Sequence, residues 1–445
     1  MKLKLSLKHA LLALSSIVFA YAAQAAGPDI QHWEAETGSR VHLVESPTLP
    51  MVDIRIDFGA GSAYDPEDKA GLASLTRRLL DTGADGLDEQ AIAERIADAG
   101  ARISGGTEND RAHLSIRALS SEDELQAAVD IAARLLARPD FPEQASARER
   151  QRSISGLRDA LTRPATIASR AYSARVFENH PYGRNTTVAS LETIERDDLQ
   201  DFHAKYYTAR NASIAIVGDV SRAQAEAIAK QLTEELAEGD AAPKPDEPAM
   251  PAHSKEHIPH PSSQAHVAAG MPGIARDDPD YFALLVGNHT LGGGGFVSRL
   301  MREVRDRQGL AYSVHSYFHP HHVKGPFRIS LQTRGSQADK AVDTVEKVLV
   351  EFVSDGPTED ELEAAKDNII NGFGLRLDSN SKLLDHVAMI GFYQLPLDWL
   401  ETYTEHVADV TTDDIRDAYS RRIRPDNLVV VIVGGDSDHT AVEAE

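Results

Sequence analysis

Apolar and polar positions follow the same order in two widely separated stretches of the chain. In residues 192–220, an Asp-rich start leads into an amphipathic helix pattern and then into the apolar run 212–218. Residues 408–436 repeat this order and reach the apolar run 428–434. Each run predicts a buried strand, and the acidic residues suit the first turn of the preceding helix, because a helix N-terminus favours negative charge.

A second pair of matching stretches lies upstream of the first. Residues 113–136 alternate apolar and polar side chains as a strand does, and then continue into an amphipathic helix. Residues 327–350 repeat the order of strand, polar turn and helix. Chance similarity between common units is the alternative explanation, but two matches in the same order favour a tandem duplication.

The pattern divides the chain into two domains. Residues 239–262 are rich in Pro, Ala and charged side chains without an apolar period, which predicts a surface linker. We therefore place an N-terminal domain at 26–240, the linker at 241–262 and a C-terminal domain at 263–445. Each half mixes strands and helices without the regular alternation of a doubly wound sheet, which favours the α+β class.

The first 25 residues have the pattern of a secretory signal peptide. Three lysines precede the apolar run 10–22, and Ala23-Gln24-Ala25 places small residues around a cleavage site. A buried N-terminal helix is the alternative. No other stretch approaches the roughly 20 apolar residues that a transmembrane helix needs. The sequence thus predicts a periplasmic protein without a membrane span.

The amino-acid composition limits the kinds of molecule that this chain can bind. Hydrophobic residues at 42% and charged residues at 26% are typical of a soluble globular protein. The formal net charge of −23 argues against binding to nucleic acid or anionic lipid. The chain has no cysteine, which excludes a thiol nucleophile.

Four motifs resemble those of the M16 metallopeptidases, the inverzincins. They are the segment FGAGSAYDPEDKAGLA at 58–73, HPYGR at 180–184, the segment from Tyr207 through Gly218, and the glycine-rich stretch from Gly292 through Val314. The resemblance covers nearly the whole chain after the signal segment. It implies two tandem homologous α+β domains (LuxS/MPP-like), each a mainly antiparallel sheet with helices packed on it.

The chain departs from this family at the zinc site. Active members carry His-x-x-Glu-His directly after Gly-Leu-Ala, and a further Glu about 76 residues later. These positions fall on Ser74, Arg77, Arg78 and, by spacing, Ser155. Catalytic zinc needs three N or O ligands and a base, and a guanidinium has no lone pair to give a metal. We therefore expect no metal bound by this chain.

Histidine clusters offer the only other metal hypothesis. Neither has a Glu at the inverted zincin spacing, so we interpret them as solvated loop histidines. The clusters are His315, His319, His321 and His322 in one stretch, and His253, His257 and His260 in the linker.

The second half keeps a candidate catalytic pair. Arg305 lies on a predicted amphipathic helix and Tyr312 follows the stop at Gly309, so both can point the same way. The resemblance implies that they hold the substrate backbone and steady the oxyanion; a surface Arg and a core Tyr are the alternative. It also implies that the loop Gly292, Gly293, Gly294 and Gly295 contacts substrate or the other half, whereas a simple flexible turn is the other interpretation.

These features predict a subunit that is inactive alone. An M16 partner carrying His-x-x-Glu-His and zinc would form a heterodimer with it and enclose unfolded peptides. The alternative is a non-enzymatic peptide-binding chaperone or scaffold with a degenerate peptidase fold. A peptidase that works alone with a relocated metal is the third hypothesis, and it requires stoichiometric zinc.

Overall fold

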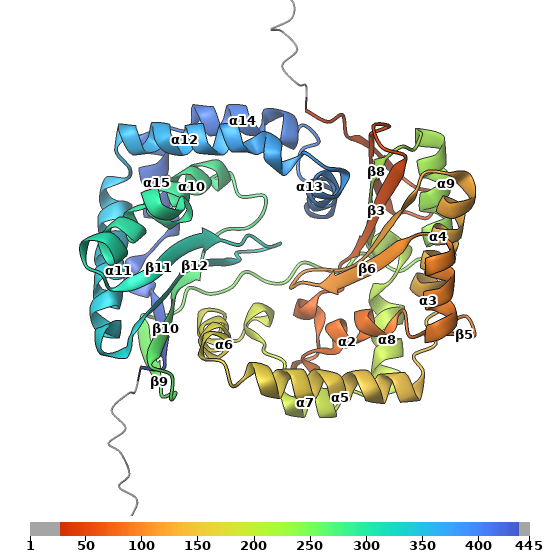
Figure 1. The fold of residues 1–445 in the computed structure, drawn as a ribbon, viewed down its shortest axis with the longest axis horizontal. Helices are drawn as coiled ribbons and strands as arrows, with labels where there is room; N and C mark the ends of the chain where they lie inside the picture. The colour runs from red at the N-terminus through yellow and green to blue at the C-terminus, as the bar shows by residue number, and fades with distance from the viewer. Residues whose placement is uncertain (1–26, 436–445) are drawn as a thin grey trace, which may run out of the picture.

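Two mixed sheets form the centres of the two halves (Figure 1). The computed structural model describes residues 27–435, so the predicted signal segment lies outside the described residues. In spatial order, the first sheet consists of β1 (Gln31–Glu34), β2 (Arg40–Glu45), β8 (Ala212–Gly218), β3 (Met51–Phe58), β7 (Ala112–Leu119) and β6 (Arg102–Thr107). The second consists of β11 (Ala311–Phe318), β12 (Pro326–Arg334), β10 (Gln264–Pro272), β13 (Val429–Val433) and β9 (Ser254–Ile258). A separate small pair is β4 (Gly83–Ala84) with β5 (Leu87–Asp88).

The two sheets share one topology once β1 is set aside. Strand β2 runs parallel to β8, as β9 runs parallel to β13. Every other neighbouring pair in the two sheets is antiparallel. The predicted α+β class, the mainly antiparallel sheets and the tandem repeat are therefore confirmed.

Helices cover both sheets. Two of them, α8 and α15, begin at the acidic residues from which a helix start was predicted. Asp198 caps α8 together with Glu195, and Asp414 caps α15 together with Thr411. Among residues 27–435, no helix is both long and apolar enough to cross a membrane. The N-terminal half has α2 (Leu72–Leu79), α3 (Glu89–Asp98), α4 (Glu122–Ala137), α5 (Glu143–Ala160), α6 (Pro164–Val176), α7 (Val188–Glu192), α8 (Arg196–Tyr206) and α9 (Arg222–Thr233). The C-terminal half has α10 (Tyr281–Asn288), α11 (Ala338–Asp355), α12 (Glu359–Phe373), α13 (Asn380–Tyr393), α14 (Trp399–Asp409) and α15 (Thr412–Arg422).

The predicted linker is not irregular throughout. Strand β9 lies inside residues 241–262 and pairs with β13 at the edge of the second sheet. Its side chains are only exposed or half-buried, which explains the missing apolar period, because its place in the sheet depends on backbone hydrogen bonds. The second part of the linker therefore belongs to the C-terminal sheet.

Each half sends one helix to the sheet of the other half (Figure 1). Helix α13 packs against β2, β3 and β8, and α6 packs against β10 and β13. A glycine allows the close approach of α13, because a Cβ at Gly391 would lie 2.5 Å from Nδ1 of His42. The exchange fixes the two halves against each other.

A fully buried carboxylate joins the halves beside these helices. Asp110 accepts hydrogen bonds from the hydroxyl of Tyr182 at 2.5 Å and from that of Tyr393 at 3.0 Å. The backbone N–H of His322 donates to the same carboxylate at 2.9 Å. Tyr393 and His322 belong to the C-terminal half, so these bonds cross between the halves and satisfy a charge that burial would otherwise penalise.

We predict that Tyr393→Phe destabilises the protein, because it removes a donor from the buried Asp110 carboxylate. The free energy of unfolding should fall by about 1.5–3 kcal/mol, as for other hydrogen bonds to charged groups. Urea denaturation followed by circular dichroism measures the change. Tyr281→Phe is the control, because the Tyr281 hydroxyl makes no hydrogen bond within residues 27–435. Equal stability of the two variants would contradict this role of Asp110.

Candidate functional site

The helix that carries the predicted zinc-ligand positions is fixed at its start by a buried carboxylate. Asp65 accepts hydrogen bonds from the backbone N–H groups of Gly71 and Ala73, both at 2.7 Å. Burial raises the pKa of Asp65 to about 6, although these two bonds act in the opposite direction. Asp65 was not among the predicted site residues. An acidic residue shortly before the helix entry Gly-Leu-Ala is typical of a helix N-terminus and could have indicated it.

Three of the four predicted zinc-site positions, Ser74, Arg77 and Arg78, line one cavity of about 620 Å³ next to α2. We call it the α2 cavity. Ser74 and Arg78 are exposed on α2, whereas Arg77 is buried. The Arg77 Nε donates to the carbonyl oxygen of His113 in β7 at 2.6 Å. Its guanidinium lies directly on β6, because a Cβ at Gly105 would come within 2.0 Å of Nη2. Arginine thus fills the space next to the sheet.

Ser155 is not brought to this cavity. It is exposed on α5 and does not line the cavity, whereas Glu149 of the same helix does and is 3% exposed. The two residues lie about one and two-thirds turns apart, so they face different directions. Sequence spacing alone missed Glu149, whose carboxylate pairs with Arg148 at 3.2 Å and with Arg152 at 3.1 Å.

The residues of this cavity do not fit zinc. No imidazole lines it, and Ser74, Arg77 and Arg78 offer no ligand set for a divalent cation. Glu149 is already held by two arginines. Within residues 27–435, no group of three His, Cys, Asp or Glu side chains is arranged to hold a metal ion.

The structure brings Arg305 and Tyr312 together at the edge of the second sheet. Arg305 lies on the π-helical segment η7 (Met301–Arg307) and Tyr312 on β11, which is an edge strand. The Arg305 guanidinium carbon lies 5.6 Å from the Tyr312 ring centroid and 4.8 Å from that of Phe296. Tyr312 is 86% exposed and Phe296 is 70% exposed. A half-buried cation thus makes cation–π contacts with two exposed rings.

Phe296 is a site residue that the sequence analysis missed. Its signal was an apolar Phe-Val pair directly after four glycines, where a solvated loop would carry polar residues. Both Phe296 and Val297 are exposed. Exposed apolar side chains next to a cation are typical of a binding surface.

The glycine-rich loop is more ordered than a flexible turn. Gly292 and Gly293 belong to the helical segment η5 (His289–Gly293), which continues α10. A Cβ at Gly292 would lie 2.4 Å from Oγ of Ser316 in β11, so this glycine has a packing role. Gly294 follows η5, and the backbone turns at Gly295 with a φ of 64°. Gly293 and Gly295 are the exposed members of the loop.

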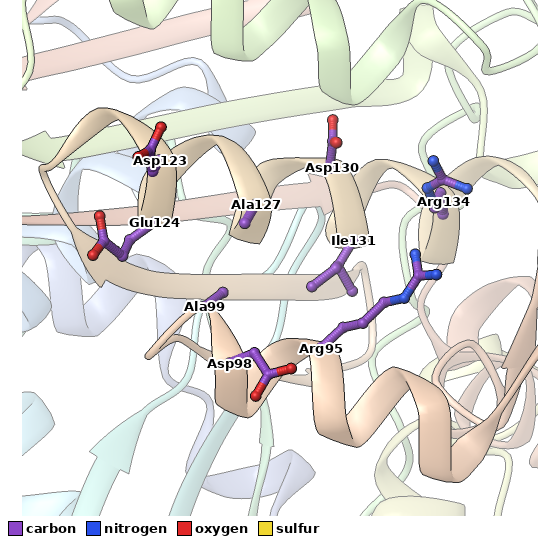
Figure 2. Close-up of a pocket in the computed structure, with 9 residues that line it drawn as sticks. All are labelled: Arg95, Asp98, Ala99, Asp123, Glu124, Ala127, Asp130, Ile131 and Arg134. Atoms are coloured by element: carbon purple, nitrogen blue, oxygen red, sulfur yellow. The ribbon is translucent and has the colours of Figure 1, made fainter.

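A second cavity, of about 240 Å³, adjoins Tyr312. Strand β11 contributes Tyr312 and His315 to its wall, β12 contributes Arg328, and α6 contributes Ala165 and Ala168. Because α6 comes from the N-terminal half, the Arg305–Tyr312 edge is built partly by the other half of the chain. A third cavity of about 380 Å³ lies between α3 and α4 and contains none of the predicted site residues (Figure 2).

The interpretation of the histidines as solvated loop residues is wrong for part of both clusters. His315 lies within β11 and His257 within β9. His321 is 6% exposed, and burial lowers its pKa to about 4. It packs against Tyr182 from the N-terminal half, a contact between distant segments that local sequence does not reveal. His253 is exposed outside any strand.

Known proteins match both halves. Residues 40–190 match the family description "Insulinase (Peptidase family M16)", and residues 193–369 match "Peptidase M16 inactive domain". A solved structure described as a peptidase M16 inactive domain from Pseudomonas fluorescens is 38% identical, with a TM-score of 0.87. That match covers 91% of this chain and 97% of the other.

Two curated relatives are more distant. A Helicobacter pylori protein named a non-peptidase homolog is 26% identical over 87% of this chain and 90% of its own length. A Bacillus subtilis protein named an uncharacterized zinc protease is 25% identical over 80% of this chain and 86% of its own. With two matched domains and a 38% identical solved relative, this chain belongs to the M16 peptidase family.

Proposed function

We propose that this chain is the metal-free subunit of an exported zinc-dependent peptidase and supplies Arg305 and Tyr312 to a zinc-bearing partner. One observation carries the proposal. The half-buried Arg305 lies against the ring of the exposed Tyr312, whereas the zinc-ligand positions hold Ser74, Arg77 and Arg78. A chain with this combination can contribute binding and charge stabilisation to peptide hydrolysis, but not the metal.

The chemistry of the pair suits a peptide under attack. The Arg305 guanidinium contacts two rings and pairs with Asp306 at 3.7 Å, so these contacts restrict its orientation before a substrate arrives. Arginine can donate to peptide carbonyl oxygens, and the tyrosine hydroxyl is a neutral donor for the developing oxyanion. The exposure of Tyr312 leaves it accessible to a second chain.

The partner in this proposal is an M16 subunit with His-x-x-Glu-His, which holds the zinc that activates water. The two subunits would form a heterodimer around an unfolded peptide. Edge strands β6 and β11 have open sides to which an extended peptide can add. The periplasmic location rests on the signal-peptide pattern of residues 1–25.

A non-enzymatic peptide-binding chaperone is the second candidate. The exposed rings of Phe296 and Tyr312 could hold peptides without any role in chemistry. The Helicobacter pylori relative is named a non-peptidase homolog, which agrees with either function.

We predict that Tyr312→Phe and Arg305→Ala each lower the kcat of the two-subunit peptidase by about a hundredfold, because the first removes a donor to the oxyanion and the second a donor that positions the peptide. Tyr312→Phe keeps the ring on which Arg305 rests, so it isolates the hydroxyl. The measurement is steady-state hydrolysis of an unfolded peptide by this chain mixed with its co-purifying zinc subunit.

Arg307→Ala is the matched control for these variants. Arg307 is exposed on the same segment and pairs with Glu303 at 2.5 Å, away from the rings. It should leave kcat within about twofold, as expected for a surface ion pair. Full activity of both Arg305→Ala and Tyr312→Phe mixtures would refute the trans-catalytic role and favour the chaperone.

We also predict that the isolated chain binds an unfolded peptide without cleaving it. Binding by fluorescence anisotropy and cleavage by mass spectrometry, before and after addition of the zinc subunit, separate the two activities. Hydrolysis should begin only with the partner, because the α2 cavity lacks metal ligands. Cleavage by the isolated chain would support a relocated metal site instead.

A further inference from the structure

The α2 cavity holds a buried cation with free hydrogen-bonding capacity. Arg77 is 6% exposed, and only its Nε has a hydrogen-bond partner within residues 27–435, the carbonyl oxygen of His113. No carboxylate in that part of the chain lies within 4.0 Å of its guanidinium. Burial lowers the pKa of Arg77, which shows that its surroundings disfavour the charged form. A buried guanidinium in this situation is stabilised by an anion.

Arg78, the next residue, is a second arginine of this cavity with unused hydrogen-bond donors. Arg78 is exposed in the cavity wall, and its one hydrogen bond goes to the Ser153 hydroxyl at 3.3 Å. It makes no ion pair within the described part of the chain. Two consecutive arginines therefore line a space of about 620 Å³ with donors to spare.

No acidic side chain in the wall forms an ion pair with Arg77 or Arg78 within residues 27–435. Glu149 is bound by Arg148 and Arg152, and Glu89 is bound by Arg148 at 2.7 Å. Asp81 also lines the cavity, and its charge raises the pKa of Arg77, but burial has the larger and opposite effect on that pKa.

The cavity adjoins an open sheet edge. Residues 104–107 of β6 line it, and β6 is the last strand of the first sheet. Gly105 has no side chain, so the Arg77 guanidinium reaches the strand backbone. An extended peptide that pairs with β6 would therefore pass the two arginines.

We propose that the cavity formed around Arg77 and Arg78 receives the C-terminal carboxylate of an extended peptide paired with β6, an inference that rests on the proposed peptide-binding role. Arginine forks bind carboxylates with two parallel hydrogen bonds. The chain's net charge of −23 disfavours peptides rich in Asp and Glu, whereas every unmodified peptide has a terminal carboxylate. The replaced zinc ligands would thus provide a recognition site for peptide ends.

The test compares three labelled peptides of one sequence without Asp or Glu: a free C-terminus, a C-terminal amide, and an amide with one internal Glu. Fluorescence anisotropy with the isolated full chain gives each Kd. We expect the free acid to bind about tenfold more tightly than either amide, the effect of one charge-assisted hydrogen bond.

Two variants test whether Arg78 causes the preference for the free acid. Arg78→Gln should reduce the preference for the free acid to about twofold or less, since it removes the exposed cation and leaves the buried Arg77 contacts intact. Arg158→Gln is the matched control, because Arg158 is exposed on α5 outside the cavity, and it should keep the tenfold preference.

The outcomes separate this inference from the proposed function. Equal binding of the free acid and the amide would overturn the carboxylate site and leave peptide binding intact. Equal binding of the free acid and the Glu-containing amide would overturn the assignment to the peptide terminus. A preference that survives Arg78→Gln would also overturn it. If no peptide binds, both proposals fail.

Discussion

The structure depends on a reciprocal exchange in which each half covers the sheet of the other. Strand β3 is buried along nearly its whole length: α13 from the other half packs on it, and its apolar side chains share a core cluster with helices of its own half. The apolar cluster around α13 joins Val44 and Val217 of the first sheet to Val387 of the C-terminal half. Helix α6 brings Tyr172 to β13 in the same way. Part of each sheet is therefore covered by the other half, and this shared apolar burial holds the two halves together (Figure 1).

The cavity beside α2 is placed by the same scaffold. Asp65 fixes the start of α2, and the helix presents residues 74, 77 and 78 to a cavity at the sheet edge. The guanidinium groups there cannot ligate zinc. At the edge of the other sheet, Arg305 lies against the exposed ring of Tyr312. The two edges therefore differ in chemistry, although the two sheets share one topology.

Local pattern predicted the fold well because the repeats carry buried apolar runs, such as 212–218 and 428–434. It missed β9, a polar edge strand held by backbone hydrogen bonds. It also missed the burial of His321, which depends on contacts with the other half. Among the site residues, sequence spacing pointed to Ser155. In the structure, it is Glu149 of the same helix that is buried and lines the cavity. The proximity of Arg305 and Tyr312 followed from their seven-residue spacing, whereas the contact of Phe296 with Arg305 depends on tertiary packing that the Phe-Val pair alone does not reveal.

The metal content of the complex isolated from the native cell envelope determines which of the two chains carries zinc. Native mass spectrometry of the intact pair, followed by analysis of each separated subunit, assigns zinc to one chain or the other. The account predicts one zinc ion for each pair of unlike chains, with none retained by this chain. Stoichiometric zinc on this chain alone, together with peptide hydrolysis by it, would contradict the account.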